Sequence, residues 1–106
     1  MPIVYKSKNN NIDYVAIQIK GKDYLFRFNS QTNSISLFSG HDLIKKFLGL
    51  IKRNFDGCIE CSLTLSISKG ISKESGIITK VDMEKNEANQ VINEINEKLG
   101  LNYPFF

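Results

Sequence analysis

Apolar and polar positions alternate over two neighbouring stretches near the start of the chain, residues 12–20 and 23–28. Such alternation is typical of strands with one buried face, and the short break between the stretches predicts a β-hairpin. Taking Gly21 and Lys22 as the loop, with the glycine at positive φ, places Lys20 opposite Asp23. The apolar pairs of this register are Ile19 with Tyr24, Ile17 with Phe26 and Val15 with Phe28. All six side chains then share one side of the sheet, which a slip of one residue would destroy.

The same pattern predicts two more strands around the hairpin. A strand over 34–38 follows a short polar loop, and the register that pairs Asn29 with Ser34 adds Ile35 and Leu37 to the same apolar face. A further strand is expected within residues 1–8, before the turn at 9–11. Together these segments form an antiparallel β-meander.

Two later stretches repeat their apolar residues at helical spacing. The first helix is expected to begin near Ser39, which serves as N-cap, to carry Asp42 in its first turn, and to end near Gly57. The second helix is expected from about residue 82 to Leu99, with Gly100 as its C-cap. Both helices are amphipathic, so each needs an apolar surface to cover.

The segment between the helices returns to strand-like patterns. Alternation over 58–67 predicts a strand, residues 69–76 form a polar turn, and residues 77–81 form another strand. This order predicts an α+β fold: a single antiparallel sheet of about five or six strands, with two amphipathic helices on one face. No linker interrupts the chain, so residues 1–106 are expected to form a single domain.

Composition limits the class of protein. At 42% hydrophobic and 24% charged residues, the chain is globular in composition, and its net charge of +3 is modest. No stretch approaches the roughly 18 to 20 apolar residues of a membrane span, and the start of the chain does not resemble a secretory signal. We therefore expect a cytoplasmic protein with no membrane partner.

Candidate catalytic chemistry is sparse. Cys58 and Cys61 form a C-x-x-C motif, but residues three apart on the predicted strand point to opposite faces, so two independent thiols, one buried and one exposed, are expected. His41 is the single histidine and is expected to be a solvated residue of the first helical turn. The glutamates of the second helix are expected to form a solvated face. No phosphate loop or pair of catalytic residue types is recognisable, so we predict no enzyme activity, no catalytic residue, no metal and no cofactor.

The outer face of the meander carries the strongest functional signal. Its aromatic, cationic and amide side chains are the mixture that stacks unpaired bases and contacts phosphates, and the first helix adds a strip of cations. We predict a small non-enzymatic module that binds single-stranded RNA or DNA through this face. The residues expected to bind nucleic acid are Tyr14, Gln18, Lys20, Arg27, Phe38, Lys45, Lys46, Lys52 and Arg53. An ordinary solvated sheet face is the competing interpretation, because aromatic residues and arginine also suit strands.

The residues at the end of the chain predict an alternative function. Residues 101–106 carry three aromatic side chains after the predicted helix, so this tail either packs back onto the sheet or inserts into a partner. The alternative function is a protein-interaction or inhibitor module, which could be a homodimer. The chain is small, and it is rich in Ile, Asn and Lys but poor in Ala and Arg, which indicates AT-rich codons; both features also fit a protein of a mobile element. The residues expected to contact a partner are Tyr103, Phe105 and Phe106.

Overall fold

A computed structural model of the chain describes residues 2–7, 11–55, 57–63, 71–74, 77–81 and 83–105. The strands are β1 (Ile3–Lys6), β2 (Ile12–Ile19), β3 (Lys22–Asn29), β4 (Ser34–Ser39), β5 (Ile71–Glu74) and β6 (Ile77–Val81). The helices are α1 (Leu43–Lys52), α2 (Ile59–Ser62) and α3 (Lys85–Leu99).

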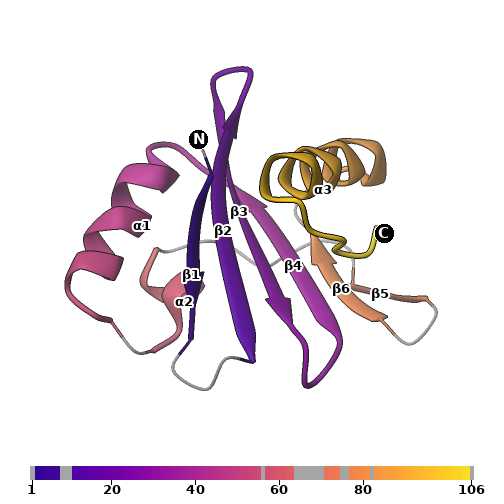
Figure 1. Cartoon of the computed structure of the whole chain (residues 1–106), viewed down its shortest axis with the longest axis horizontal. Helices are drawn as coiled ribbons and strands as arrows, with labels where there is room; N and C mark the ends of the chain where they lie inside the picture. Colours follow the sequence, from indigo (N-terminus) through magenta and orange to yellow (C-terminus); the bar gives the residue numbers. More distant parts are fainter. Residues whose placement is uncertain are drawn as a thin grey trace.

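The strands form one sheet at the centre of the molecule (Figure 1). Strands β1 to β4 make an antiparallel meander, which confirms the expected α+β class and the expected strand before the hairpin. Within the described residues, the strand order across the sheet is β1-β2-β3-β4-β6-β5. The expectation of a wholly antiparallel sheet is wrong, because β6 runs parallel to β4. The connection from β4 to β6 contains α1, and such a long crossover lets the chain return in the same direction.

The β2–β3 hairpin has the predicted faces but a different register. Its loop residues are Lys20 and Gly21, with φ values of 53° and 77°, so Ile19 and not Lys20 closes the hairpin opposite Lys22. Two consecutive positive φ values match the twist of the flanking strands, and glycine then occupies the second loop position. The pairing moves by two residues, to Ile17 with Tyr24, and therefore leaves every side chain on its predicted face. The predicted β3–β4 register is confirmed, with Asn29 opposite Ser34.

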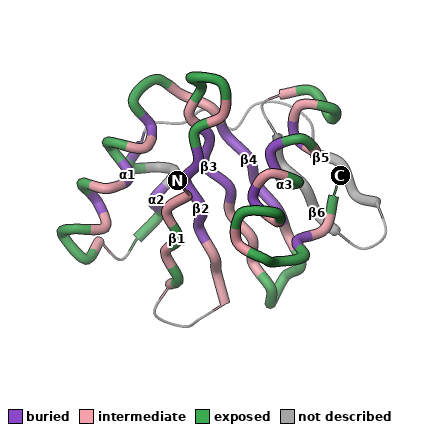
Figure 2. The backbone as a smooth tube through the Cα atoms, turned by 45° about the horizontal axis from the view of Figure 1, so that its top comes forward, coloured by how far each residue is buried: buried purple, intermediate pink, exposed green. Residues whose placement is uncertain are grey.

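The two long helices lie on opposite sides of the sheet, which contradicts the expectation that both cover one face (Figure 1). The apolar residues of α3 pack on the face that carries Val15, Ile17 and Phe26. The apolar residues of α1 pack on the other face, against Leu25 and Phe38. The middle strands are consequently buried on both sides, while the outer surfaces of the helices are exposed (Figure 2). The described elements thus form three layers, with the sheet in the middle.

The N-terminus of α1 is capped from a neighbouring strand. Asp42, and not Ser39, is the N-cap residue; it adopts a left-handed conformation with φ 53° and makes no side-chain cap hydrogen bond. The backbone N–H of Ile44 instead donates to Oδ2 of Asp23 on β3, at 3.1 Å. A carboxylate at this position satisfies one free amide and complements the helix dipole.

The region between α1 and α3 departs from the predicted pattern. Part of the predicted strand over 58–67 is the short helix α2, whose Ile59 is buried with the side chains of α1, and residues 64–70 lie outside the described residues. Alternation of residue types was misleading here, because one helical turn can bury Ile59 and Leu63, which are four apart, on one side. Residues 71–74, expected to be a turn, form strand β5, and the predicted strand over 77–81 is confirmed as β6. Gly100, with φ 64°, ends α3 as predicted.

Candidate functional site

The face of the meander that was expected to stack bases lies in the interior. Tyr14 and Phe38 are 4% and 1% exposed, because α1 covers them. The ring of Tyr14 packs against Phe47 of α1, with 6.2 Å between the ring centroids. Neither ring can accept a stacked base while α1 is in place, so the premise that this face is exposed is wrong.

The polar residues that the same predicted site takes from the sheet are only partly brought together. Gln18 is exposed and its side-chain amide donates to Oδ1 of Asp23 at 2.9 Å. Lys20 stands at the exposed hairpin turn, whereas Arg27 is half-buried, opposite Tyr14 and Ser36 in the sheet. Gln18 and Lys20 both line a hollow at the hairpin turn, whereas Arg27 does not, so the structure does not join the three residues into one surface.

The four cations of α1 do form a continuous surface. We call Lys45, Lys46, Lys52 and Arg53 the α1 basic face; all four are exposed. Lys45 and Lys52 are seven residues apart, as are Lys46 and the C-cap residue Arg53, so the four cations occupy one side of the helix over about 12 Å of its axis. Ion pairs hold Lys6, Lys22 and Lys98 to carboxylates elsewhere, but no described carboxylate pairs with the α1 basic face. This arrangement leaves positive charge available to an external anion.

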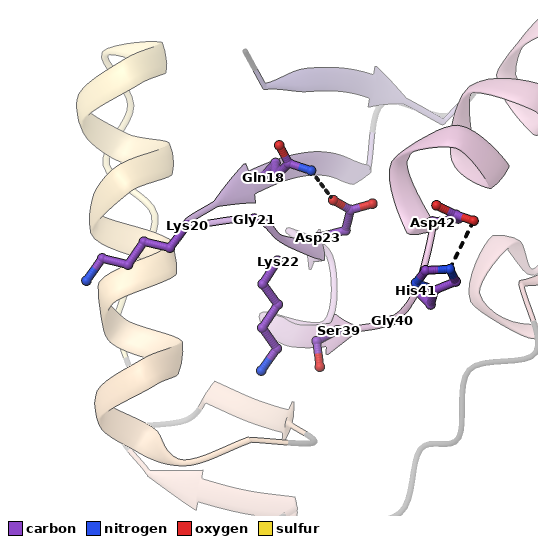
Figure 3. Close-up of a pocket in the computed structure, with 9 residues that line it drawn as sticks. All are labelled: Gln18, Lys20, Gly21, Lys22, Asp23, Ser39, Gly40, His41 and Asp42. Atoms are coloured by element: carbon purple, nitrogen blue, oxygen red, sulfur yellow. Dashed lines mark hydrogen bonds and ion pairs between the residues drawn. The ribbon is translucent and has the colours of Figure 1, made fainter.

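A polar hollow of about 480 Å³ lies between the hairpin turn and the start of α1. Its lining residues are Gln18, Lys20, Gly21, Lys22, Asp23, Ser39, Gly40, His41 and Asp42 (Figure 3). Asp23 is held by Gln18 and by the N–H of Ile44, and His41 pairs with Asp42 at 3.3 Å. The side chain of His41 is 95% exposed, so water surrounds it. The described residues contain no cluster of three side chains suited to a metal ion, and the groups of this hollow serve to join the hairpin to α1.

The C-terminal tail is anchored through Tyr103. This residue is 8% exposed, its ring packs on Phe26 and Phe28, and its hydroxyl donates to Oδ2 of Asp13 at 2.8 Å. Burial and the neighbouring carboxylate raise the pKa of Tyr103 above its ordinary value. The side chain of Asn96 bonds both the backbone N–H and the backbone oxygen of Tyr103. Tyr103 is thus a core residue and not a partner contact.

Only part of the predicted partner-binding tail remains exposed. Phe105 is 50% exposed and Leu101 is 45% exposed. Phe106 lies outside the described residues. The tail therefore combines a packed anchor with two exposed apolar side chains beside it.

Glu87 makes contacts to strand β3 that the sequence did not predict. Its carboxylate Oε2 accepts a hydrogen bond from Tyr24 at 2.6 Å and pairs with Lys22 at 2.9 Å, which joins α3 to β3. The hydrogen bonds from Lys22 and Tyr24 hold the pKa of Glu87 below its usual value. The glutamates of α3 are therefore not a uniformly solvated face; no periodic signal in the sequence distinguishes Glu87 from the others.

The C-x-x-C motif lies at a helix and not along a strand. Cys58 is exposed, directly precedes α2 and is disulfide-bonded, and Cys61 is the other cysteine of the chain. The expectation of independent thiols is wrong for Cys58, because the helical turn replaced the strand on which that expectation depended.

Comparison with known families, with curated proteins and with solved structures finds no match for this chain. Among the described residues, no helix is long and apolar enough to cross a membrane.

Proposed function

We propose that this chain is a non-enzymatic module that binds nucleic acid, and that it does so through the α1 basic face. The observation that carries this proposal is the set of four exposed cations on α1 and its C-cap residue, without a described carboxylate partner. Clustered positive charge binds the phosphate backbone by releasing condensed counterions. The preference for single strands depended on stacking by Tyr14 and Phe38, so we do not retain it.

Phosphate contacts predict a characteristic salt dependence. If all four cations contact phosphates, the logarithm of the association constant falls by about 3 to 4 for each tenfold rise in salt. Binding of this type is weak at physiological salt, with a Kd of about 1 to 100 µM. Single strands and duplexes should both bind, because backbone contacts carry little sequence information.

Fluorescence anisotropy with labelled 20-nucleotide single strands and duplexes tests the proposal. The double variant Lys45→Gln/Lys52→Gln should lower affinity roughly tenfold or more and should reduce the salt slope by about 1.5. The matched control is Lys85→Gln/Lys98→Gln, which removes the same charge from α3 on the opposite side of the sheet. Absence of binding by the unchanged protein at low salt would overturn the proposal, as would equal losses in the two double variants.

A second candidate function, a protein-interaction module, is favoured by the exposed apolar side chains of Leu101 and Phe105. They stand beside the anchored Tyr103, so an apolar partner could bind them without unfolding the tail. A homodimer is one form of this candidate. Light scattering of the unchanged protein and of Phe105→Ser tests it: a dimer that the substitution dissociates supports it, and a monomer in both contradicts the homodimer. A cytoplasmic location stays a prediction.

A further inference from the structure

Gly49 is an unexplained residue in the interior of α1. Glycine is the poorest helix former after proline, and it is ordinarily kept inside a helix by close packing. A Cβ atom added at Gly49 would meet nothing within 4 Å, and the residue is exposed. Neither packing within the described structure nor a positive φ therefore requires glycine here.

Gly49 lies at the centre of the α1 basic face. Lys45 and Lys46 precede it by four and three residues, and Lys52 and Arg53 follow it by three and four. Residues three and four apart are neighbours on a helix surface, so the two pairs of cations flank Gly49 on either side along the axis. The position without a side chain is thus bordered by the positive charges of the helix.

The start of α1 is unsuited to an anion. The carboxylate of Asp23 accepts the N–H of Ile44, and Asp42 carries a second carboxylate at the N-cap. These negative charges offset the positive end of the helix dipole and repel phosphate. An anionic ligand would therefore contact α1 through its middle, between the two pairs of cations, where Gly49 lies.

We propose that a nucleic-acid strand crosses α1 at Gly49, with its phosphodiester backbone in direct contact with the helix main chain and with the two pairs of cations on either side. This inference rests on the proposed function, since it assumes that the α1 basic face binds nucleic acid. The missing side chain brings the phosphates closer to the helix than any other residue would permit. Gly49 is accordingly a positioning residue, and the cations supply the attraction.

The density of charge favours nucleic acid over an acidic protein as the ligand. Duplex DNA carries one negative charge for each 1.7 Å or so of its axis, which gives about seven over the roughly 12 Å occupied by the α1 basic face. Four cations placed around one bare helix position match such a dense and regular anion. Carboxylates on a folded protein surface are more widely spaced and interspersed with lysine and arginine.

The test adds bulk at Gly49 without changing charge. Gly49→Gln places a long neutral side chain of good helix propensity over the proposed contact, and Gly49→Ala adds a single methyl group. Gln90→Ala, at an exposed position of α3, controls for a change in helix propensity away from the site. Anisotropy with the 20-nucleotide duplex and single strand should show about a tenfold weaker affinity for Gly49→Gln, a smaller loss for Gly49→Ala, and no change for Gln90→Ala. Thermal unfolding should show both Gly49 variants folded and at least as stable as the unchanged protein.

The outcomes separate this inference from the proposed function. If Lys45→Gln/Lys52→Gln weakens binding while Gly49→Gln binds as the unchanged protein does, the role of Gly49 is overturned and the proposed function stands. If the unchanged protein does not bind either oligonucleotide, both fail. If poly-glutamate of equal total charge binds as tightly as the duplex, the ligand is an acidic polypeptide and the assignment to nucleic acid is overturned.

Discussion

Asp23 should be the residue that starts α1, although it belongs to a strand. Its Oδ2 accepts the Ile44 N–H at 3.1 Å and its Oδ1 accepts the Gln18 amide at 2.9 Å. Removing a side-chain cap costs about 0.5 to 2 kcal/mol, and the exposed bond from Gln18 adds a few tenths, so Asp23→Ala should lower the free energy of unfolding by about 1 to 2 kcal/mol. For a domain of this size, the midpoint of thermal unfolding then falls by about 5 to 15 °C.

Two variants sharpen the measurement. Asp23→Asn keeps an oxygen acceptor but loses the charge that complements the helix dipole, so it should cost about half as much. Asp42→Asn is the control: its side chain makes no cap hydrogen bond, and asparagine tolerates the left-handed conformation with φ 53°, so a change within about 0.5 kcal/mol is expected. Urea unfolding followed by circular dichroism measures all three. If Asp42→Asn destabilises the protein more than Asp23→Ala does, Asp42 and not Asp23 stabilises the start of α1, and the proposed role of Asp23 is wrong.

Three further predictions test the packing, the charge contacts and the glycine. Phe47→Ala should destabilise the protein by about 3 to 5 kcal/mol in urea unfolding, because Phe47 is fully buried between α1 and the sheet; a loss below 1 kcal/mol would mean that α1 does not cover this face. The lowered pKa of Glu87 means that its stabilisation is present at neutral pH and is lost as the pH falls below the ordinary value of 4.5. Glu87→Gln should therefore reduce the loss of stability between neutral pH and pH 3, and Glu97→Gln, which alters an exposed carboxylate, should not. Gly49→Ala should raise the free energy of unfolding by about 0.5 to 1 kcal/mol, and a decrease would show that the glycine has a structural role in α1.

The strands of the meander, and the face on which each of their side chains lies, were predictable from the local pattern of apolar and polar residues. Alternation in 12–20 and 23–28 placed the apolar set of β2 and β3 on one face, and the structure packs that set against α3. The exact hairpin register was not predictable from the same pattern, because shifting the pairing by two residues preserves every face. It was decided by Lys20 and Gly21, which both adopt positive φ.

The burial of the second sheet face also had a signal in the sequence, which the alternating pattern obscured. The face predicted to be outer carries four apolar or aromatic side chains, Tyr14, Ala16, Leu25 and Phe38. The middle strands therefore contain short continuous apolar runs, over residues 14–17, 24–26 and 37–38. Such runs are typical of strands with a covered surface on both sides. This composition favours a helix over Tyr14 and Phe38 and a nucleic-acid contact elsewhere on the surface.

By itself the sequence determined the elements of the meander, the two long helices, the Gly100 cap and the cationic side of α1, because each depends on neighbours within a few residues. Only the tertiary structure decided that α1 and α3 cover opposite faces, that β6 runs parallel to β4, and that Asp23 caps a helix. The physical reason is that an apolar stripe specifies that a helix must be buried and leaves open against which of two apolar sheet faces. Because α1 covers the sheet face that was predicted to bind nucleic acid, that face belongs to the core. The α1 basic face is the candidate binding surface that remains exposed.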